Sequence, residues 1–91
     1  MMKLDTPLTI PPQVMSRPVG DETVLLNLES GIYFGLDGIG RLIWESVSAG
    51  KTLGHAVQTI VGEYEVDPAR AEADVLAFAS DLVDRGLLAE T

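Results

Sequence analysis

Side chains able to act as acids, bases or nucleophiles are few in this sequence of 91 residues. The single histidine, His55, has apolar neighbours and no carboxylate close by in sequence, so a surface or half-buried histidine fits better than a general base or a metal ligand. No cysteine is present, which leaves neither a thiolate metal site nor a disulfide framework. These residues predict no metal site.

Carboxylates and hydroxyls show no catalytic arrangement either. Acids at helical spacing occur late in the chain, where a solvated helix face explains them better than an acid–base pair does: Glu72, Asp74, Asp81 and Asp84. The serines lie outside any G-x-S-x-G motif, and none follows the Asp-Ser-Leu pattern that carries the prosthetic arm of acyl carrier proteins. We therefore expect a protein that is not an enzyme and that uses no cofactor.

The glycine-rich segment GLDGIGR resembles a phosphate-binding loop only superficially. Its glycines, Gly35, Gly38 and Gly40, have the spacing G-x-x-G-x-G rather than that of the dinucleotide fingerprint, and no lysine follows. The second half of a βαβ unit is also missing. We expect Gly35 to ease the exit from a strand, and Gly38 and Gly40 to permit close packing of a helix on a sheet.

The element best suited to a binding function is a hairpin over residues 24–36. With a three-residue loop closed by a left-handed Gly31, the predicted pairs lie on one apolar face: Val24 with Leu36, Leu26 with Phe34 and Leu28 with Ile32. The second strand, residues 32–36, is expected to be a sheet edge. A free edge can pair with a peptide.

The other elements follow from apolar spacing and from capping residues. Residues 14–19 predict a first strand, and Pro18 confines it to an edge or a strand end. Three helices are expected after the hairpin, with N-caps at Asp37, Thr52 and Asp67 and with the last helix stopping at Gly86. The sequence thus predicts an α+β, winged-helix-like fold, in which a three-stranded antiparallel sheet precedes three helices. Residues 1–12 are expected to form a flexible N-terminal arm, followed by one domain over residues 13–91.

Charge disfavours a nucleic-acid partner. Six basic and fourteen acidic side chains give a net charge of −8, which repels phosphate backbones. Residues 53–65, in the position of a recognition helix, contain only His55 as a basic residue. A winged-helix DNA-binding regulator remains the alternative that topology allows. The first dozen residues lack the features of a signal peptide, and no run approaches a membrane span, so a cytoplasmic protein without a membrane partner is expected.

The stretch VLLNLESGIYFGLDGIGRLIWESV, the helix beginning at Asp67-Pro68 and the ending LVDRGLLAE together point to a family. Over residues 14–90 the chain resembles the PqqD-like recognition domains of ribosomally synthesised, post-translationally modified peptides. The matching positions are Leu26, Gly31, Tyr33, Leu36, Ile43, Trp44, Leu82, Gly86 and Leu87. The resemblance implies a noncatalytic module that captures the leader segment of a precursor peptide as an antiparallel strand, in the cleft between the third strand and the third helix.

Carried onto this sequence, the resemblance implies a backbone ladder along Ile32, Tyr33, Phe34, Gly35 and Leu36. The residues expected opposite, on the third helix, are Asp74, Val75, Phe78, Ala79, Asp81, Leu82 and Arg85. Pockets for peptide side chains are expected from Tyr33, Val75, Phe78 and Leu82. The acids at 74 and 81 suggest a leader with a basic residue.

A small protein of this kind is similar to the free-standing leader-binding proteins of lasso-peptide biosynthesis. That likeness implies delivery of the precursor to a leader peptidase and then to an ATP-dependent cyclase. Quinone-cofactor pathways use a similar peptide chaperone beside a radical enzyme, and this alternative stays open. So does a structural docking subunit of a modifying enzyme, which would use the same edge without a peptide ligand.

Overall fold

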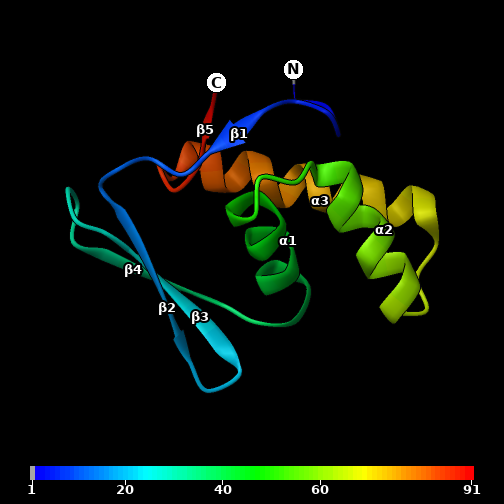
Figure 1. Cartoon of the computed structure of the whole chain (residues 1–91), viewed down its shortest axis with the longest axis horizontal. Coiled ribbons are helices and arrows are strands. Elements are labelled where there is room, and N and C mark those ends of the chain that lie inside the picture. Colours follow the sequence, from blue (N-terminus) through cyan, green and yellow to red (C-terminus); the bar gives the residue numbers. More distant parts are fainter. Residues whose placement is uncertain (1) are drawn as a thin grey trace.

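The computed structural model describes residues 2–91 and consists of two small sheets and three helices (Figure 1). The larger sheet is antiparallel, in the order β2-β3-β4, from strands β2 (Val14–Val19), β3 (Glu22–Asn27) and β4 (Ile32–Leu36). The helices α1 (Gly38–Ser48), α2 (Leu53–Glu63) and α3 (Pro68–Asp84) follow in that order. The predicted α+β class, a three-stranded antiparallel sheet followed by three helices, is confirmed.

Local hydrogen bonds set the helix boundaries where the sequence indicated them. The hydroxyl oxygen of Thr52 accepts a hydrogen bond of 3.1 Å from the backbone N–H three residues later, at the start of α2. A carboxylate oxygen of Asp67 does the same at 3.2 Å for α3, where Pro68 is the first residue. Gly50 and Gly86, at φ of 77° and 75°, follow the ends of α1 and α3 in the left-handed conformation. The caps predicted at Thr52 and Asp67 and the helix end predicted at Gly86 are therefore confirmed, whereas Asp37 lies at the N-cap position of α1 without a side-chain capping hydrogen bond within the described residues.

The predicted register of the β3–β4 hairpin is wrong by one residue. We expected Val24, Leu26 and Leu28 to face the core. The observed pairs are Thr23 with Leu36, Val24 with Gly35, Leu25 with Phe34, Leu26 with Tyr33 and Asn27 with Ile32. Leu25 is fully buried, whereas Val24 and Leu26 are only partly buried and Leu28 lies in the loop with 57% of its surface exposed.

The cause is the turn chemistry of Asn27. Its side-chain oxygen accepts hydrogen bonds from the backbone N–H groups of Glu29 (2.9 Å) and Ser30 (3.3 Å), and its carbonyl oxygen accepts one from Gly31 N–H (2.7 Å). These bonds close a four-residue loop over residues 28–31 instead of the expected three-residue loop. Gly31 does adopt the predicted left-handed conformation, with φ of 74°.

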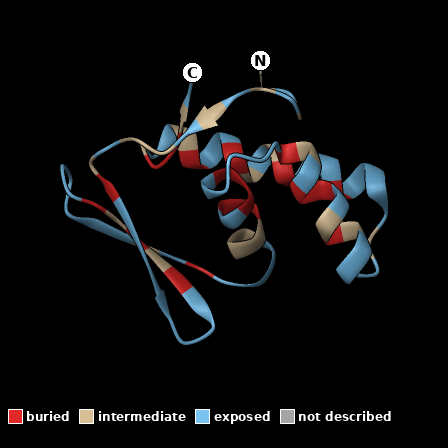
Figure 2. Cartoon of the chain, viewed as in Figure 1, coloured by how far each residue is buried: buried red, intermediate tan, exposed pale blue. Residues whose placement is uncertain are grey.

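The core lies where the inner face of the sheet meets the three helices (Figure 2). Its largest fully buried side chains come from β3, from every helix and from the segment after α3: Trp44, Leu25, Ile43, Leu53, Ile60, Leu82, Leu88 and Val75. Burial of Leu87 and Leu88 shows that the tail folds back on the core, as predicted.

A short ribbon joins the two ends of the chain. Strand β1 (Leu8–Thr9) pairs antiparallel with β5 (Ala89–Glu90), and Thr91 N–H donates to the carbonyl oxygen of Pro7 at 3.1 Å. Leu4 packs against the core, and its carbonyl oxygen accepts a hydrogen bond of 3.1 Å from Gly54 N–H of α2. Much of the segment expected as an arm thus lies on the domain. Its flexibility stays a prediction.

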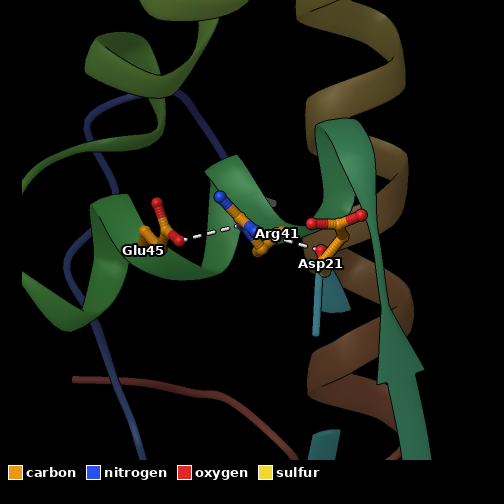
Figure 3. Close-up of polar contacts among 3 residues, drawn as sticks. All are labelled: Asp21, Arg41 and Glu45. Atoms are coloured by element: carbon orange, nitrogen blue, oxygen red, sulfur yellow. Dashed lines mark hydrogen bonds and ion pairs between the residues drawn. The ribbon is translucent and has the colours of Figure 1, made fainter. Parts of the chain in front are cut away.

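Arg41 joins the sheet to α1 (Figure 3). Its Nη1 donates to the backbone carbonyl oxygen of Asp21 at 3.0 Å, in the turn between β2 and β3. Its Nε lies 3.1 Å from Oε1 of Glu45, one helical turn further along α1. These contacts hold the β2–β3 turn against the start of α1, which directly follows β4.

Among the helices described, none combines the length and the apolarity that a membrane span requires.

Candidate functional site

Strand β4 is paired along one edge only. Its neighbour is β3, and no other strand of residues 2–91 pairs with its second edge. The opposite edge of the sheet, β2, contains Pro18, which has no N–H to donate to a further strand. The edge prediction for residues 32–36 is therefore confirmed, and β4 is the better edge for an added strand.

A large cavity of about 570 Å³ lies at the end of β4 where the chain enters α1. Its lining comes from β4, from the first turns of α1 and from α3: Phe34, Gly35, Leu36, Asp37, Gly38, Ile39, Gly40, Ile43, Asp74 and Phe78. Most of these side chains are apolar, and two carboxylates, Asp37 and Asp74, lie among them. Such a lining suits an apolar side chain with a polar or basic neighbour.

A smaller cavity of about 110 Å³ lies at the opposite end of β4. It is lined by Asn27, Ser30, Ile32, Phe34, Arg85 and Leu87. The guanidinium carbon of Arg85 lies 4.9 Å from the centre of the Phe34 ring, a cation–π geometry. Because Phe34 lines both cavities, they are neighbours along β4, and we refer to them together as the groove.

On α3 the predicted site residues form two parallel stripes with different exposure. Asp74, Phe78, Asp81 and Arg85 recur at steps of three and four, and each has exposed or partly exposed surface. The other three, Val75, Ala79 and Leu82, are fully buried. Val75, Ala79 and Leu82 therefore belong to the core and line neither cavity of the groove. That they contact a peptide stays a prediction.

On β4 the side chains alternate between the two faces of the sheet. Phe34 and Leu36 point inward with their partners Leu25 and Thr23, and Phe34 and Leu36 line the groove. Tyr33, with 70% of its surface exposed, pairs with Leu26 on the other face and lines neither cavity. Of the four residues expected to build the pockets, only Phe78 lines the groove.

Several groove residues were not among those predicted. The start of α1 contributes Asp37, Gly38, Ile39, Gly40 and Ile43, and the turn and the tail contribute Asn27, Ser30 and Leu87. The glycine pattern predicted close packing of a helix on the sheet at Gly38 and Gly40. At Gly40 the close neighbour is Phe78 of α3 instead, and a Cβ on Gly38 would meet no described atom within 4 Å beyond its chain neighbours and its own helix backbone. Cζ of Phe78 lies 3.0 Å from the position that a Cβ of Gly40 would take.

The two acids predicted on α3 each lie beside an arginine. The carboxylate of Asp81 pairs with Arg85 Nε at 3.0 Å, and Asp74 lies 3.7 Å from Arg70 Nε, so these two acids face cations rather than each other. His55 is exposed on α2 and lines neither cavity. Within residues 2–91, no three histidine, aspartate or glutamate side chains converge into a metal site.

Comparison with known proteins gives two structural matches. The chain superimposes with a TM-score of 0.83 and 40% identity on a structure described as TbiB1 in complex with the TbiA(beta) leader peptide, over 88% of this chain and 93% of that one. It superimposes with a TM-score of 0.85 and 26% identity on a lasso peptide synthetase B1 complexed with the leader peptide, over 91% of this chain and 98% of that one. No curated protein matches the sequence significantly.

The sequence also matches the profile of a protein family. The profile described as Coenzyme PQQ synthesis protein D (PqqD) matches residues 22–88, from the start of β3 to the buried tail after α3. That range contains β4, α3 and every residue of the groove. The chain therefore belongs to the PqqD family, as its resemblance to PqqD-like recognition domains predicted.

Proposed function

We propose that this protein binds the leader segment of a ribosomally synthesised precursor peptide by adding it to β4 as an antiparallel strand beside α3. The observation that carries the proposal is the unpaired edge of β4, flanked by two cavities, in a fold that superimposes on two proteins solved with leader peptides. The unpaired edge supplies backbone hydrogen bonds, and the cavities accept alternate side chains.

The energetics suit a reversible capture of a disordered peptide. Ordering such a segment opposes binding, so ladder hydrogen bonds and a few apolar anchors must exceed that cost. Backbone hydrogen bonds form with peptides of many sequences and stabilise them to a similar extent. Selection among leaders therefore falls to the side chains around the groove, with Phe34 at its centre and Phe78 in the large cavity.

In this proposal the protein does no chemistry itself. It presents the precursor to a leader peptidase and then to an ATP-dependent cyclase, as in lasso-peptide biosynthesis. The support for a lasso pathway is the likeness to a lasso peptide synthetase B1 over 98% of that chain, whereas the family description names coenzyme PQQ synthesis. A quinone-cofactor precursor is thus the second ligand to compare.

Fluorescence anisotropy of a labelled leader tests binding and its location. The probes are the TbiA(beta) leader peptide and the leader of a quinone-cofactor precursor. We expect saturable binding that Phe34→Asp weakens at least tenfold, because the charge would enter both cavities. The matched control is Tyr33→Asp, which places the same charge one residue away on the exposed outer face and should leave affinity within about threefold.

An N-methyl scan of the leader backbone tests strand addition separately from side-chain contacts. In a β-strand every second N–H points to the same neighbour, so methylation should weaken binding at alternate positions. Losses without this period would contradict strand addition to β4. Failure of both leaders to bind would favour a docking subunit, and salt-dependent binding of duplex DNA would favour a regulator.

A further inference from the structure

Arg85 places a guanidinium at the small-cavity end of the groove, and its half-exposed ion pair with Asp81 offsets only part of the positive charge. Its Nε donates to Oδ2 of Asp81 at 3.0 Å, and its guanidinium stacks on the Phe34 ring at 4.9 Å. The side-chain hydrogen bond that Arg85 makes within residues 2–91 uses Nε, which leaves the terminal nitrogens for another acceptor. A guanidinium held in this way is suited to a carboxylate, because little side-chain freedom is lost when the contact forms.

The large-cavity end carries the opposite charge. Asp37 and Asp74 both line that cavity. Asp37 precedes α1, and no side-chain hydrogen bond from it caps the helix within the described chain. Arg70 lies 3.7 Å from Asp74, but both side chains are more than two-thirds exposed, so this pair neutralises Asp74 only weakly. A basic side chain is favoured at this end.

Because the added strand has a direction, the charges at the two ends of the groove favour one order of charged residues along the peptide. Strand β4 runs from Ile32 beside the small cavity to Leu36 beside the large one. An antiparallel peptide runs the other way, so its earlier residues face Leu36 and its later residues face Ile32. Residues opposite these two positions are four apart, about 14 Å along a strand, and both point to the groove face.

We propose that the groove selects leaders by the order of their charges, with a basic residue four positions before an acidic one. The basic residue lies between Asp37 and Asp74, and the acidic residue lies against Arg85. This inference rests on the proposed leader binding and adds the class of leader that the groove selects. It also assigns Asp37, Asp74 and Arg85 as specificity-determining residues.

The test is a set of peptides with equal composition and reversed charge order. In the TbiA(beta) leader peptide, each pair of residues four apart is replaced by Lys then Glu, and in the matched peptide by Glu then Lys. At one register we expect the Lys-first peptide to bind about tenfold more tightly, with the difference shrinking as salt rises. With the pair at any other two leader positions, the Lys-first and Glu-first peptides should bind with equal affinity.

Charge-reversed protein variants supply the reciprocal test. The double variant Asp74→Lys with Arg85→Glu keeps the net charge and should invert the preference, so that the Glu-first peptide binds more tightly. The control, Glu72→Lys with Lys51→Glu, makes the same exchange at exposed residues that line neither cavity, and it should keep the original preference. Circular dichroism verifies that both variants are folded.

The outcomes separate this inference from the proposed function. Equal affinity for both charge orders at every register, with the unmodified leader bound, would overturn the charge rule and leave leader binding intact. A preference for the Glu-first peptide on the unchanged protein would overturn it as well, since that result requires a parallel strand. If the unmodified leader does not bind, the proposed function itself fails.

Discussion

At the scale of single residues, the absence of one side chain determines how deep the groove is. A Cβ on Gly40 would lie 3.0 Å from Cζ of Phe78, closer than such carbons normally approach, whereas its distance of 3.5 Å from Cε1 is an ordinary contact. Glycine thus lets the Phe78 ring lie against α1, where it forms one wall of the large cavity. A larger residue would push the ring into the space that a peptide side chain would fill.

Gly40→Leu should therefore weaken leader binding while preserving the fold. Because the displaced ring can move into an open cavity, and because leucine favours a helix over glycine by about 0.8 kcal/mol, we expect the free energy of unfolding to stay within about 1 kcal/mol of its original value. Leader affinity should fall at least tenfold by anisotropy. The control is Gly62→Leu in α2, where no atom of residues 2–91 outside the local helix backbone lies within 4 Å of the added Cβ. Equal affinity of both variants would contradict the role of Gly40.

At the scale of elements, the sequence predicted two of the three side-chain caps, because Asp37 makes no capping hydrogen bond within the described residues, and it did not predict the strand register. Thr52 and Asp67 start their helices as predicted, because a cap depends on residues only three positions apart. In the hairpin, the three consecutive apolar residues 24–26 place at least one leucine inward in either register, and the observed inner face of β3 combines Leu25 with the polar Thr23 and Asn27. Asn27 decided between the registers through its turn hydrogen bonds.

For the groove too, some features could be predicted from the sequence and others could not. The edge position of β4 followed from the number of strands, and the place of α3 beside it was implied by the family resemblance, with helical spacing indicating its face. The division of that face into an exposed stripe and a buried one did not, since it depends on how deeply α3 packs on the sheet. The stacking of Arg85 on Phe34 joins residues 51 positions apart in the sequence, and no local pattern encodes such a contact.

Asn27→Ala should destabilise the hairpin. Asn27 is 8% exposed, and its side chain satisfies two backbone N–H groups of the loop, so we expect a loss of about 1–2 kcal/mol in the free energy of unfolding. Asn27→Asp retains the accepting oxygen and should recover most of that loss. Urea denaturation followed by the fluorescence of Trp44, the only tryptophan, provides the measurement. Equal destabilisation by both substitutions would show that the oxygen acceptor is not what the turn requires.

At the scale of the whole molecule, the two chain ends secure the side of the groove that contains Arg85. Leu87 lines the small cavity two residues after Arg85, and β5 begins two residues after Leu87. The pairing of β5 with β1 fixes the end of this segment, and Figure 1 shows β1 and β5 beside the C-terminal end of α3. The N-terminal segment is therefore coupled to the groove through β5, although it contributes no residue to either cavity.

Two neighbouring substitutions in β1 test this coupling. Leu8 packs against the core and Thr9 is exposed, so Leu8→Ala should lower the free energy of unfolding by about 1–2 kcal/mol, and Thr9→Ala by less than about 0.5 kcal/mol. Hydrogen exchange should show faster exchange of the amides of residues 87–91 in Leu8→Ala, because loosening β1 releases its partner β5. Leader affinity should fall modestly in the same variant, since Leu87 loses its fixed position. Unchanged exchange in residues 87–91, together with a lowered stability, would mean that β1 supports the core without restraining the end of the groove.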